Sequence, residues 1–297
     1  MQDLSDPHSR KKARHTLAEG DVDPLSEAVS RRDRDTVEMV KDALASKRAV
    51  LAYQPVVVSS DPGKTAFYEG LVRILDSTGR PIPAKQFMSE VEDTEIGRMI
   101  DCLALELGLQ TLAAEKDIRL AVNLSARSIG YPRWTRTLDA GLSLDPTIAE
   151  RLILEIEERS AMTTPELVTA FMRDLQQRGI SFALDDFGAG FTSFRYLRDF
   201  FFDIVKIDGA FSRDLSRNPD NQVVIEALLL VAQQFEMFTV AENVESAMDA
   251  EILSRMGVDC MQGFHFGAPT LRPPWLPDAE NAQGGGVLGS LRRRNQR

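Results

Sequence analysis

The sequence has few of the residues that form disulfides or bind soft metal ions. Its 297 residues include two cysteines, Cys102 and Cys260, and three histidines, His8, His15 and His265. The cysteines have no CxxC spacing and the histidines are scattered, so we expect neither a disulfide framework nor a zinc site. This cysteine usage is typical of a reducing compartment, and it favours a cytoplasmic location.

Long apolar runs and excess positive charge are also missing. No apolar stretch approaches the roughly 20 residues that cross a bilayer, and the N-terminus is too polar for a signal peptide. The formal net charge is −10, so the chain lacks the basic character with which proteins bind nucleic-acid polymers. We therefore expect no membrane span and no DNA or RNA polymer as a partner. A small phosphate ligand stays compatible with this charge, because a bound metal ion reverses the local sign.

Composition divides the chain into three parts. Residues 1–35 are polar and without sustained periodicity, which indicates a mobile arm with at most one short helix. Residues 276–297 combine a glycine run with four arginines, so we expect a disordered basic tail. A tail that contacts an acidic partner or a membrane surface is the alternative. Residues 36–275 are left as the folded domain.

Short apolar runs alternate with amphipathic segments in this domain. Eight runs are rich in Val, Ile, Leu and Phe, as strands covered on both faces are, and "RLILEIE" and "SFALDD" are two of them. Between them, "TTPELVTAFMRDLQQRG" has helical spacing, with Pro165 in its first turn and Gly179 at its end. Eight strands with intervening helices predict an α/β fold of the (β/α)8 TIM-barrel type. A doubly wound open sheet is the alternative, because local pattern does not reveal closure.

Polar residues stand inside or at the ends of seven of the eight predicted strands. In a parallel barrel these ends open onto one face, where active sites lie. One such residue alone is more often a helix cap or an ion-pair partner, but all of them lie in or beside apolar runs, where unpaired polar groups are costly. In chain order they are Glu69, Asn123, Glu155, Asp185 with Asp186, Lys206, Glu242 and Gln262.

The carboxylates among these residues indicate a metal site. Carboxylates that lie close together repel each other unless some are protonated or a cation lies between them. Oxygen ligands without Cys or His favour hard ions, Mg²⁺ or Mn²⁺ and also Ca²⁺, over zinc. The adjacent Asp185 and Asp186 either reach one ion each, or one binds an ion while the other holds a water. The first arrangement is a two-metal site, which suits in-line displacement at phosphorus.

Eight short stretches resemble the EAL domain family of cyclic di-GMP phosphodiesterases, and they occur in the family's order between residues 42 and 269. They read "YQPVV", "EGLVR", "VNLSA", "LEIEE", "DDFGAGF", "VKID", "AENVE" and "QGFHFGAP". The resemblance implies a barrel of the EAL type with one antiparallel strand and two Mg²⁺ or Mn²⁺ ions at its mouth. It also implies hydrolysis of cyclic di-GMP, a bacterial second messenger, to linear pGpG, with inhibition by Ca²⁺. A homodimer through the loop and helix after Asp186 is a further implication.

The resemblance also implies a role for each matched residue. The matched ligands of the first metal ion are Glu69, Asn123, Glu155 and Asp185. Asp186 matches a ligand of the second metal ion. Glu242 matches a residue that is either a further ligand of this ion or the general base. Lys206 matches the lysine that contacts the attacking water, and with Glu242 and Glu69 it makes up the catalytic set. The matched substrate contacts are Gln54, Arg73 and Gln262. Two acids match residues that hold the "DDFG" loop, with a structural salt bridge as the alternative for each: Glu158 and Glu245.

The sequence departs from the family pattern around the second-metal side. Gly70 replaces the usual alanine of the signature triplet, Ala189 replaces a threonine, Asn243 replaces a glycine, and "RDFFFDIVKID" lacks a Leu-Pro pair. We expect these changes to affect the rate more than binding. An active phosphodiesterase is preferred because every matched catalytic position keeps its residue type. The alternative is a catalytically weak or inactive EAL domain that serves as a cyclic di-GMP receptor, and Arg73 with the acids argues against a scaffold that ignores the nucleotide.

Overall fold

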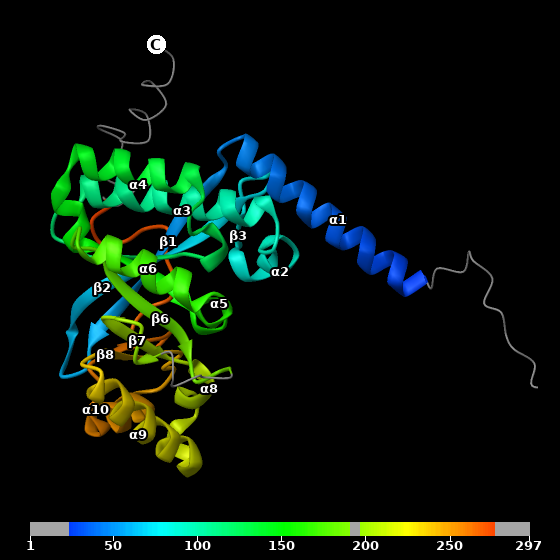
Figure 1. The fold of residues 1–297 in the computed structure, drawn as a ribbon. Helices are drawn as coiled ribbons and strands as arrows, with labels where there is room; N and C mark the ends of the chain where they lie inside the picture. Colours follow the sequence, from blue (N-terminus) through cyan, green and yellow to red (C-terminus); the bar gives the residue numbers. More distant parts are fainter. Residues whose placement is uncertain (1–23, 191–196, 277–297) are drawn as a thin grey trace, which may run out of the picture.

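The computed structural model describes residues 24–190 and 197–276, and within these ranges the strands form a closed barrel (Figure 1). Neighbouring strands follow the order β1-β9-β8-β7-β6-β5-β4-β2, and the pairing of β1 with β2 closes the ring. The strands are β1 (Ala49–Val58), β2 (Asp61–Leu75), β4 (Leu120–Asn123), β5 (Leu152–Glu157), β6 (Ser181–Phe187), β7 (Ile204–Ile207), β8 (Phe238–Ala241) and β9 (Cys260–Gln262). The open-sheet alternative is therefore excluded, and the predicted barrel is confirmed.

Strand direction confirms the predicted antiparallel strand. The strands from β2 to β9 run parallel in the ring, whereas β1 pairs antiparallel with both of its neighbours, β2 and β9. A short strand, β3 (Pro81–Pro83), extends β2 outside the ring. Because β1 and β2 form a hairpin of adjacent segments, the barrel closes through a local contact at one side and a long-range one, β1 with β9, at the other.

Helices cover the outside of the barrel. They are α1 (Pro24–Ala45), α2 (Met88–Val91), α3 (Glu95–Ala114), α4 (Pro132–Leu144), α5 (Glu158–Thr163), α6 (Pro165–Gln176), α8 (Gly209–Ser212), α9 (Pro219–Gln234) and α10 (Ala247–Met256), with 3-10 turns η1 (Ala84–Gln86), η2 (Ala126–Ser128), η3 (Pro146–Arg151) and η4 (Leu215–Arg217). The sequence sets several of their ends. Thr94 caps α3 by accepting the N–H of Ile96 at 3.2 Å, and α6 begins at Pro165, as predicted.

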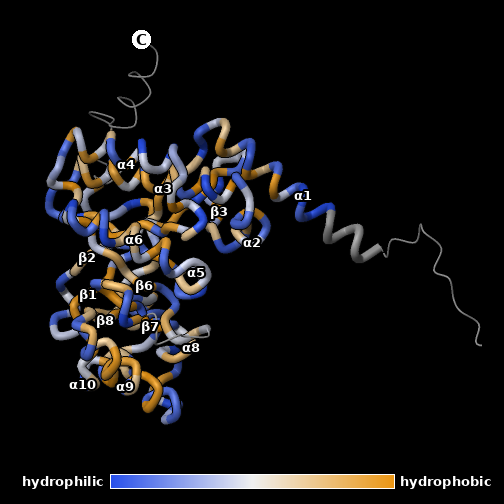
Figure 2. The backbone as a smooth tube through the Cα atoms, viewed as in Figure 1, coloured by the Kyte–Doolittle hydropathy of each residue, from blue (hydrophilic) through white to orange (hydrophobic). Residues whose placement is uncertain are grey.

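The chain's ends were predicted to be an arm and a tail. Helix α1 runs through residue 35, where the sequence placed the boundary between arm and domain. It extends away from the barrel, and hydrophilic residues dominate its described part, while apolar residues follow the barrel strands (Figures 1 and 2). Most of the predicted arm, residues 1–23, and the tail from residue 277 lie outside the described residues, so both stay predictions. Among the described residues, no helix combines the length and apolar character needed to span a membrane.

The barrel interior is apolar in its lower half and polar at its mouth. A cluster of buried side chains fills the lower half: Val56, Phe67, Ala121, Ile153, Ala183, Ile204 and Val240, with Cys260 packed against it. Side chains two positions apart on a strand point to the same face. Gln54 and the polar strand-end residues predicted from the sequence, except Asp186, stand two positions along the chain from one of these side chains. The same alternation that fills the core therefore gathers these polar residues above it.

Candidate active site at the barrel mouth

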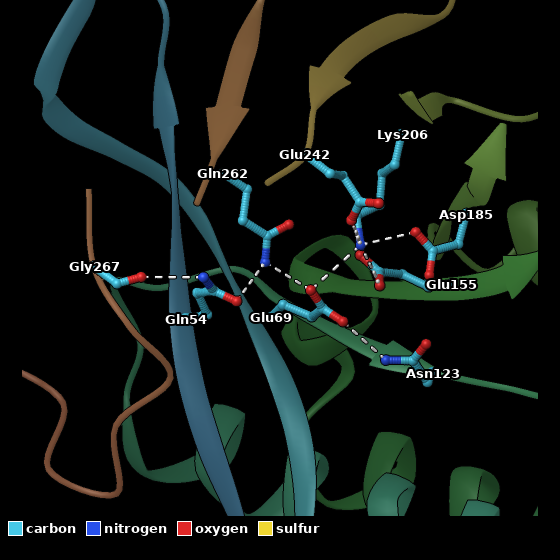
Figure 3. A network of polar contacts seen from close by, with 9 residues as sticks. All are labelled: Gln54, Glu69, Asn123, Glu155, Asp185, Lys206, Glu242, Gln262 and Gly267. Atoms are coloured by element: carbon cyan, nitrogen blue, oxygen red, sulfur yellow. Dashed lines mark hydrogen bonds and ion pairs between the residues drawn. The ribbon is translucent and has the colours of Figure 1, made fainter. Parts of the chain in front are cut away.

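Lys206 lies at the centre of the polar layer (Figure 3). Its side chain is 1% exposed, and its Nζ lies 2.9 Å from Glu242, 3.0 Å from Asp185, 3.1 Å from Glu155 and 3.3 Å from Glu69. Burial lowers the pKa of Lys206, but the four carboxylates outweigh burial and hold that pKa well above its usual value. The ammonium group is therefore the counter-ion of all four acids.

The positive charge of one lysine does not balance four carboxylates, and the pKa values of two of these acids are raised. Burial and the charge of Glu69 raise the pKa of Glu155 well above its usual value. Burial raises the pKa of Glu242 to about 8, although Lys206 opposes the shift. The pKa of Glu69 is instead lowered, because Lys206, Gln262 and Asn123 together outweigh its burial. The site therefore carries more acid than its own cation compensates.

The amides of the site order Glu69 from two sides. The side-chain N–H of Asn123 donates to Glu69 Oε1 at 3.0 Å, and that of Gln262 donates to Glu69 Oε2 at 2.7 Å. Gln262 also donates to Gln54 at 3.3 Å, and Gln54 donates to the carbonyl of Gly267 at 3.1 Å. This network places the predicted residues of β1, β2, β4 and β9 in contact with one another (Figure 3).

The site has a buried floor and an open rim. Gln54, Glu69, Glu155, Lys206 and Gln262 are buried, whereas Asp185, Asp186 and Glu242 are half-buried and Asn123 is exposed. A ligand entering from solvent would therefore meet the rim first. On β2, Arg73 follows Glu69 by four positions on the same strand face and is half-buried, and its guanidinium group donates to the carbonyl of Val72 at 3.0 Å. Burial lowers the pKa of Arg73 while Glu69 opposes the shift.

A break in the regular strand explains how two adjacent aspartates join one cluster. Neighbours on a regular strand point to opposite faces. In β6, the register with β7 shifts between Leu184 and Phe187, and Asp186 has a left-handed backbone with φ of 56°. Such a bulge re-aims a side chain. As a result, one carboxylate oxygen each from Asp185, Asp186 and Glu242 lies within 4.8 Å of the others, close enough to hold a metal ion.

The donor set fits a hard divalent cation. All the candidate ligand atoms are oxygens, the ligands that Mg²⁺ and Mn²⁺ prefer. One of them, Glu155 Oε1, is buried and has no hydrogen-bond partner among the described residues, and the same is true of Gln262 Oε1 beside Glu69. Burial and the neighbouring Asp185 raise the pKa of Asp186 to about 7. A bound cation would give the buried oxygens a partner, and it would stabilise the charged form of the acids that otherwise hold protons.

The two acids predicted to hold the "DDFG" loop lie in different places. Glu158 is buried, and its Oε2 accepts the backbone N–H of Gly188 in that loop at 3.2 Å. Glu245 is half exposed and lies 3.6 Å from the guanidinium of Arg213. The geometry of Glu245 agrees with the alternative, a structural salt bridge. Asp208, the N-cap of α8, was not predicted as a site residue, yet its carboxylate contributes to the raised pKa of Asp186. Its place after Lys206 in "VKID" was the available signal.

Two of the departures from the family pattern have a local structural account. Asn243 has a left-handed backbone with φ of 52°, a conformation that asparagine tolerates better than most residues. Its amide packs on Gly209, where a Cβ atom would lie 1.8 Å from Asn243 Nδ2. At Gly70, a Cβ atom would lie 3.2 Å from the Leu51 side chain. Ala189 is exposed, and its N–H closes the turn to Asp186 at 3.1 Å.

Fold and site together define a TIM-type barrel with an acidic mouth whose oxygen ligands suit a divalent cation. Residues 37–269 match the EAL domain family, so the chain belongs to that family. It is 29% identical over 234 residues to cyclic di-GMP phosphodiesterase PdeB of Shewanella oneidensis, covering 77% of this chain and 27% of PdeB. It is 28% identical over 248 residues to cyclic di-GMP phosphodiesterase PdeF of Escherichia coli, covering 81% of this chain and 33% of PdeF. The chain thus spans about a third of the length of these curated relatives.

Solved structures of EAL domains share the fold. The MucR phosphodiesterase in complex with c-di-GMP has a TM-score of 0.69 and 28% identity, covering 80% of this chain and 97% of that one. The FimX EAL domain of Pseudomonas aeruginosa bound to c-di-GMP has a TM-score of 0.72 and 24% identity, covering 80% of this chain and 96% of that one. At that identity the FimX likeness concerns the fold alone.

Proposed function

We propose that this chain hydrolyses cyclic di-GMP to linear pGpG with the help of two divalent cations, Mg²⁺ or Mn²⁺. The observation that carries the proposal is the oxygen-only ligand set gathered around Lys206, which is complete for every position matched from the family. The EAL family membership and the phosphodiesterase relatives support the same substrate and reaction.

The residues divide naturally between holding cations and handling the substrate. Bound ions would neutralise the phosphodiester charge and lower the pKa of a water molecule. Lys206, with its ammonium group fixed among four carboxylates, orients the attacking water and offsets developing negative charge. Glu242, half-buried beside Lys206, is placed to hold the second ion or to accept a proton. The ions would be held by Glu69, Asn123, Glu155 and Asp185 for one, and by Asp185, Asp186 and Glu242 for the other.

Substrate binding falls to the residues around Glu69. The guanidinium of Arg73 is suited to a phosphate group, which guanidinium binds through paired hydrogen bonds. Gln54 and Gln262 offer amide groups on the buried floor beside Glu69. An ester held between these groups and the cations would present its phosphorus to the water near Lys206.

The second candidate is a receptor that binds cyclic di-GMP with little or no turnover. The altered loops favour it, because Asn243 follows Glu242 directly in a left-handed conformation and Ala189 lacks the hydroxyl of the family residue. We further propose inhibition by Ca²⁺, a cytoplasmic location and a homodimer through the loop and helix after Asp186. Residues 191–196 of that region lie outside the described residues, and size-exclusion chromatography with light scattering tests the dimer.

Turnover is tested by incubating the protein with cyclic di-GMP and either Mg²⁺ or Mn²⁺, followed by chromatographic separation of the nucleotides. Formation of pGpG that stops with EDTA or with excess Ca²⁺ supports the proposal, and Glu69→Ala serves as the inactive control. Tight binding of cyclic di-GMP without pGpG at either metal would instead support the receptor. Turnover that survives Glu69→Ala would contradict the assignment of the metal ligands.

A further inference from the structure

Asp101 is a buried acid that the proposed chemistry does not use. It lies on α3, outside the barrel, and is 6% exposed. No ion pair of Asp101 is found among the described residues. Burial raises its pKa to about 7, although hydrogen bonds from Ser128 and Ser125 lower it. A carboxyl group buried without a cation is costly, so its contacts need a physical account.

Those contacts hold the segment that follows Asn123. Asp101 Oδ2 accepts the hydroxyl of Ser128 at 2.5 Å and the backbone N–H of Ser125 at 3.2 Å. Ser128 is fully buried, so its hydroxyl has no access to water as a substitute partner. A side chain without an acceptor at position 101 would leave the buried hydroxyl of Ser128 and the half-buried N–H of Ser125 without this partner. The carboxyl group of Asp101 therefore binds hydrogen-bond donors of the 124–128 segment rather than a cationic side chain.

The other backbone N–H groups at the start of this segment bond to neighbouring site elements. Leu124 donates to the carbonyl of Glu155 at 2.8 Å, and Ala126 donates to Ser160 Oγ on α5 at 3.0 Å. The segment is thus held on three sides, by α3, β5 and α5. Of these three supports, Asp101 is the only one that binds it at two positions.

We propose that Asp101 is a positioning residue, which fixes segment 124–128 and thereby directs the side chain of Asn123 toward Glu69 and the candidate metal centre. Asn123 is the exposed last residue of β4, and the last hydrogen bond between β4 and β5 is the one that Leu124 donates to Glu155, so the direction of Asn123 depends on how the segment from Leu124 is held. Its amide already meets Glu69 at 3.0 Å. The inference rests on the proposed function, because it takes Asn123 as a ligand of a divalent cation.

The test compares three variants of the full chain, with Mn²⁺ alone as the probe. Asp101→Ala removes the acceptor of both bonds. Asp101→Asn keeps one carbonyl oxygen, and a single oxygen accepts both bonds in the structure. Asp259→Ala is the matched control, because Asp259 Oδ2 also accepts one backbone N–H and one hydroxyl, both from Thr239, at the opposite end of the barrel. Each variant is titrated with Mn²⁺, and amide hydrogen exchange of residues 124–128 is measured in EDTA.

The expected result is a selective loss. Asp101→Ala should weaken Mn²⁺ binding about tenfold, the low end of the effect of residues that orient metal ligands. Its 124–128 amides should exchange faster in EDTA, while Asp101→Asn keeps both properties and Asp259→Ala keeps the Mn²⁺ affinity. If Asp101→Ala does not fold, Ser128→Ala, which removes one of the two bonds, should show a smaller loss in the same direction.

Two outcomes in the variants would overturn the inference. One is Mn²⁺ affinity at the wild-type level in Asp101→Ala despite faster exchange, which would make Asp101 purely structural. The other is an equal loss in Asp259→Ala, which would make the effect one of general stability. A wild-type protein that binds Mn²⁺ but forms no pGpG would refute the proposed hydrolysis and leave the role of Asp101 standing. A wild-type protein that binds no Mn²⁺ would refute both.

Discussion

Replacing Lys206 by methionine tests how the acids of the site are held without a metal ion. The change keeps a long unbranched side chain and removes the ammonium group. In the structure this group lies 2.9–3.3 Å from four carboxylates, and the lysine is 1% exposed. The variant therefore leaves Glu69, Glu155, Asp185 and Glu242 facing one another without a positive charge.

The size of the effect follows from burial. Removing one partner of a buried ion pair costs about 3–5 kcal/mol, because the other charge stays buried without compensation. Four acids share the lost cation here, but protons replace part of it, since Glu155 and Glu242 already have raised pKa values. We therefore expect a loss of about 3–5 kcal/mol at pH 7.5 in EDTA. For a domain of this size, that loss lowers the melting temperature by about 6–20 °C.

Thermal unfolding followed by circular dichroism measures the loss. The matched control is Lys116→Met, because Lys116 pairs with Asp145 at the surface, where ion pairs contribute little. Lowering the pH to 5 should narrow the gap between Lys206→Met and the wild type, because the buried acids then carry protons. Added Mn²⁺ should stabilise the variant more than the wild type, because the ion takes over the role of the ammonium group.

The reasoning would be refuted by a Lys206→Met protein that melts at the wild-type temperature in EDTA at pH 7.5. It would also fail if the destabilisation grew on acidification, since protonation of the acids must relieve their repulsion. A loss of stability no larger than that of Lys116→Met would mean that the carboxylates become exposed to solvent in the variant, and that the packing around Lys206 is not rigid.

Three further outcomes are expected. Glu69→Gln should lower the rate of pGpG formation by more than about 100-fold, which is the upper end of the effect of residues that only hydrogen-bond to a metal ligand. A smaller loss would contradict the assignment of Glu69 as a metal ligand. In EDTA, the free energy of unfolding measured with urea should fall as pH rises from about 4 to 8. Burial raises the pKa of Glu242 to about 8 and that of Asp186 to about 7, so the folded state binds more protons than the unfolded state over this range. A free energy of unfolding that rises over the same range would contradict these pKa shifts. Gly209→Ala should lower the free energy of unfolding by about 1–3 kcal/mol, because the added methyl group clashes with Asn243. Adding Asn243→Gly should recover most of this loss in a double-mutant cycle, whereas additive effects would show that the two residues are not in contact.

The fold and the residues of the mouth were predictable because both follow from strand alternation. Ile153 and Glu155, two positions apart on β5, share the inner face, and so do Ala183 and Asp185 on β6. An apolar run that ends in a polar residue therefore indicates both a strand and its place in the barrel. Barrel closure depends on the pairing of β1 with β9, a contact between segments about 200 positions apart that no local pattern encodes.

Backbone geometry after the strands was not predictable from spacing. Glu155 and Glu158 have the same spacing as Glu242 and Glu245, yet Glu158 is buried against the loop and Glu245 is half exposed. Helix α5 begins at Glu158 immediately after β5, which turns this residue inward. After β8 the chain passes instead through the left-handed Asn243, and α10 begins only at Ala247. The same motif therefore gives two different side-chain directions.

Asp101 shows what helical periodicity could have revealed. It lies among the buried residues Ile96, Ile100, Ala104 and Leu105 of α3, so a helical projection would have put an acid on the inner face. Its partners, Ser125 and Ser128, are separated from it by a loop and a strand. Tertiary structure alone brings them together, which is why the sequence identified Asn123 but not the residue that holds the segment behind it.

The departure at Asn243 lies in the connection after β8 and is accommodated there. The Asn243 side chain occupies space that Gly209 leaves free by lacking a Cβ atom, and the Glu242 N–H still bonds to the β7 carbonyl of Ile207 at 3.3 Å. The strand that carries Glu242 therefore keeps its place although the next residue differs. A chain in the course of losing its chemistry has no physical reason to retain four carboxylates around one buried lysine, because their mutual repulsion destabilises the fold. The cost of keeping them, together with the compensation at Gly209, favours the phosphodiesterase over the receptor.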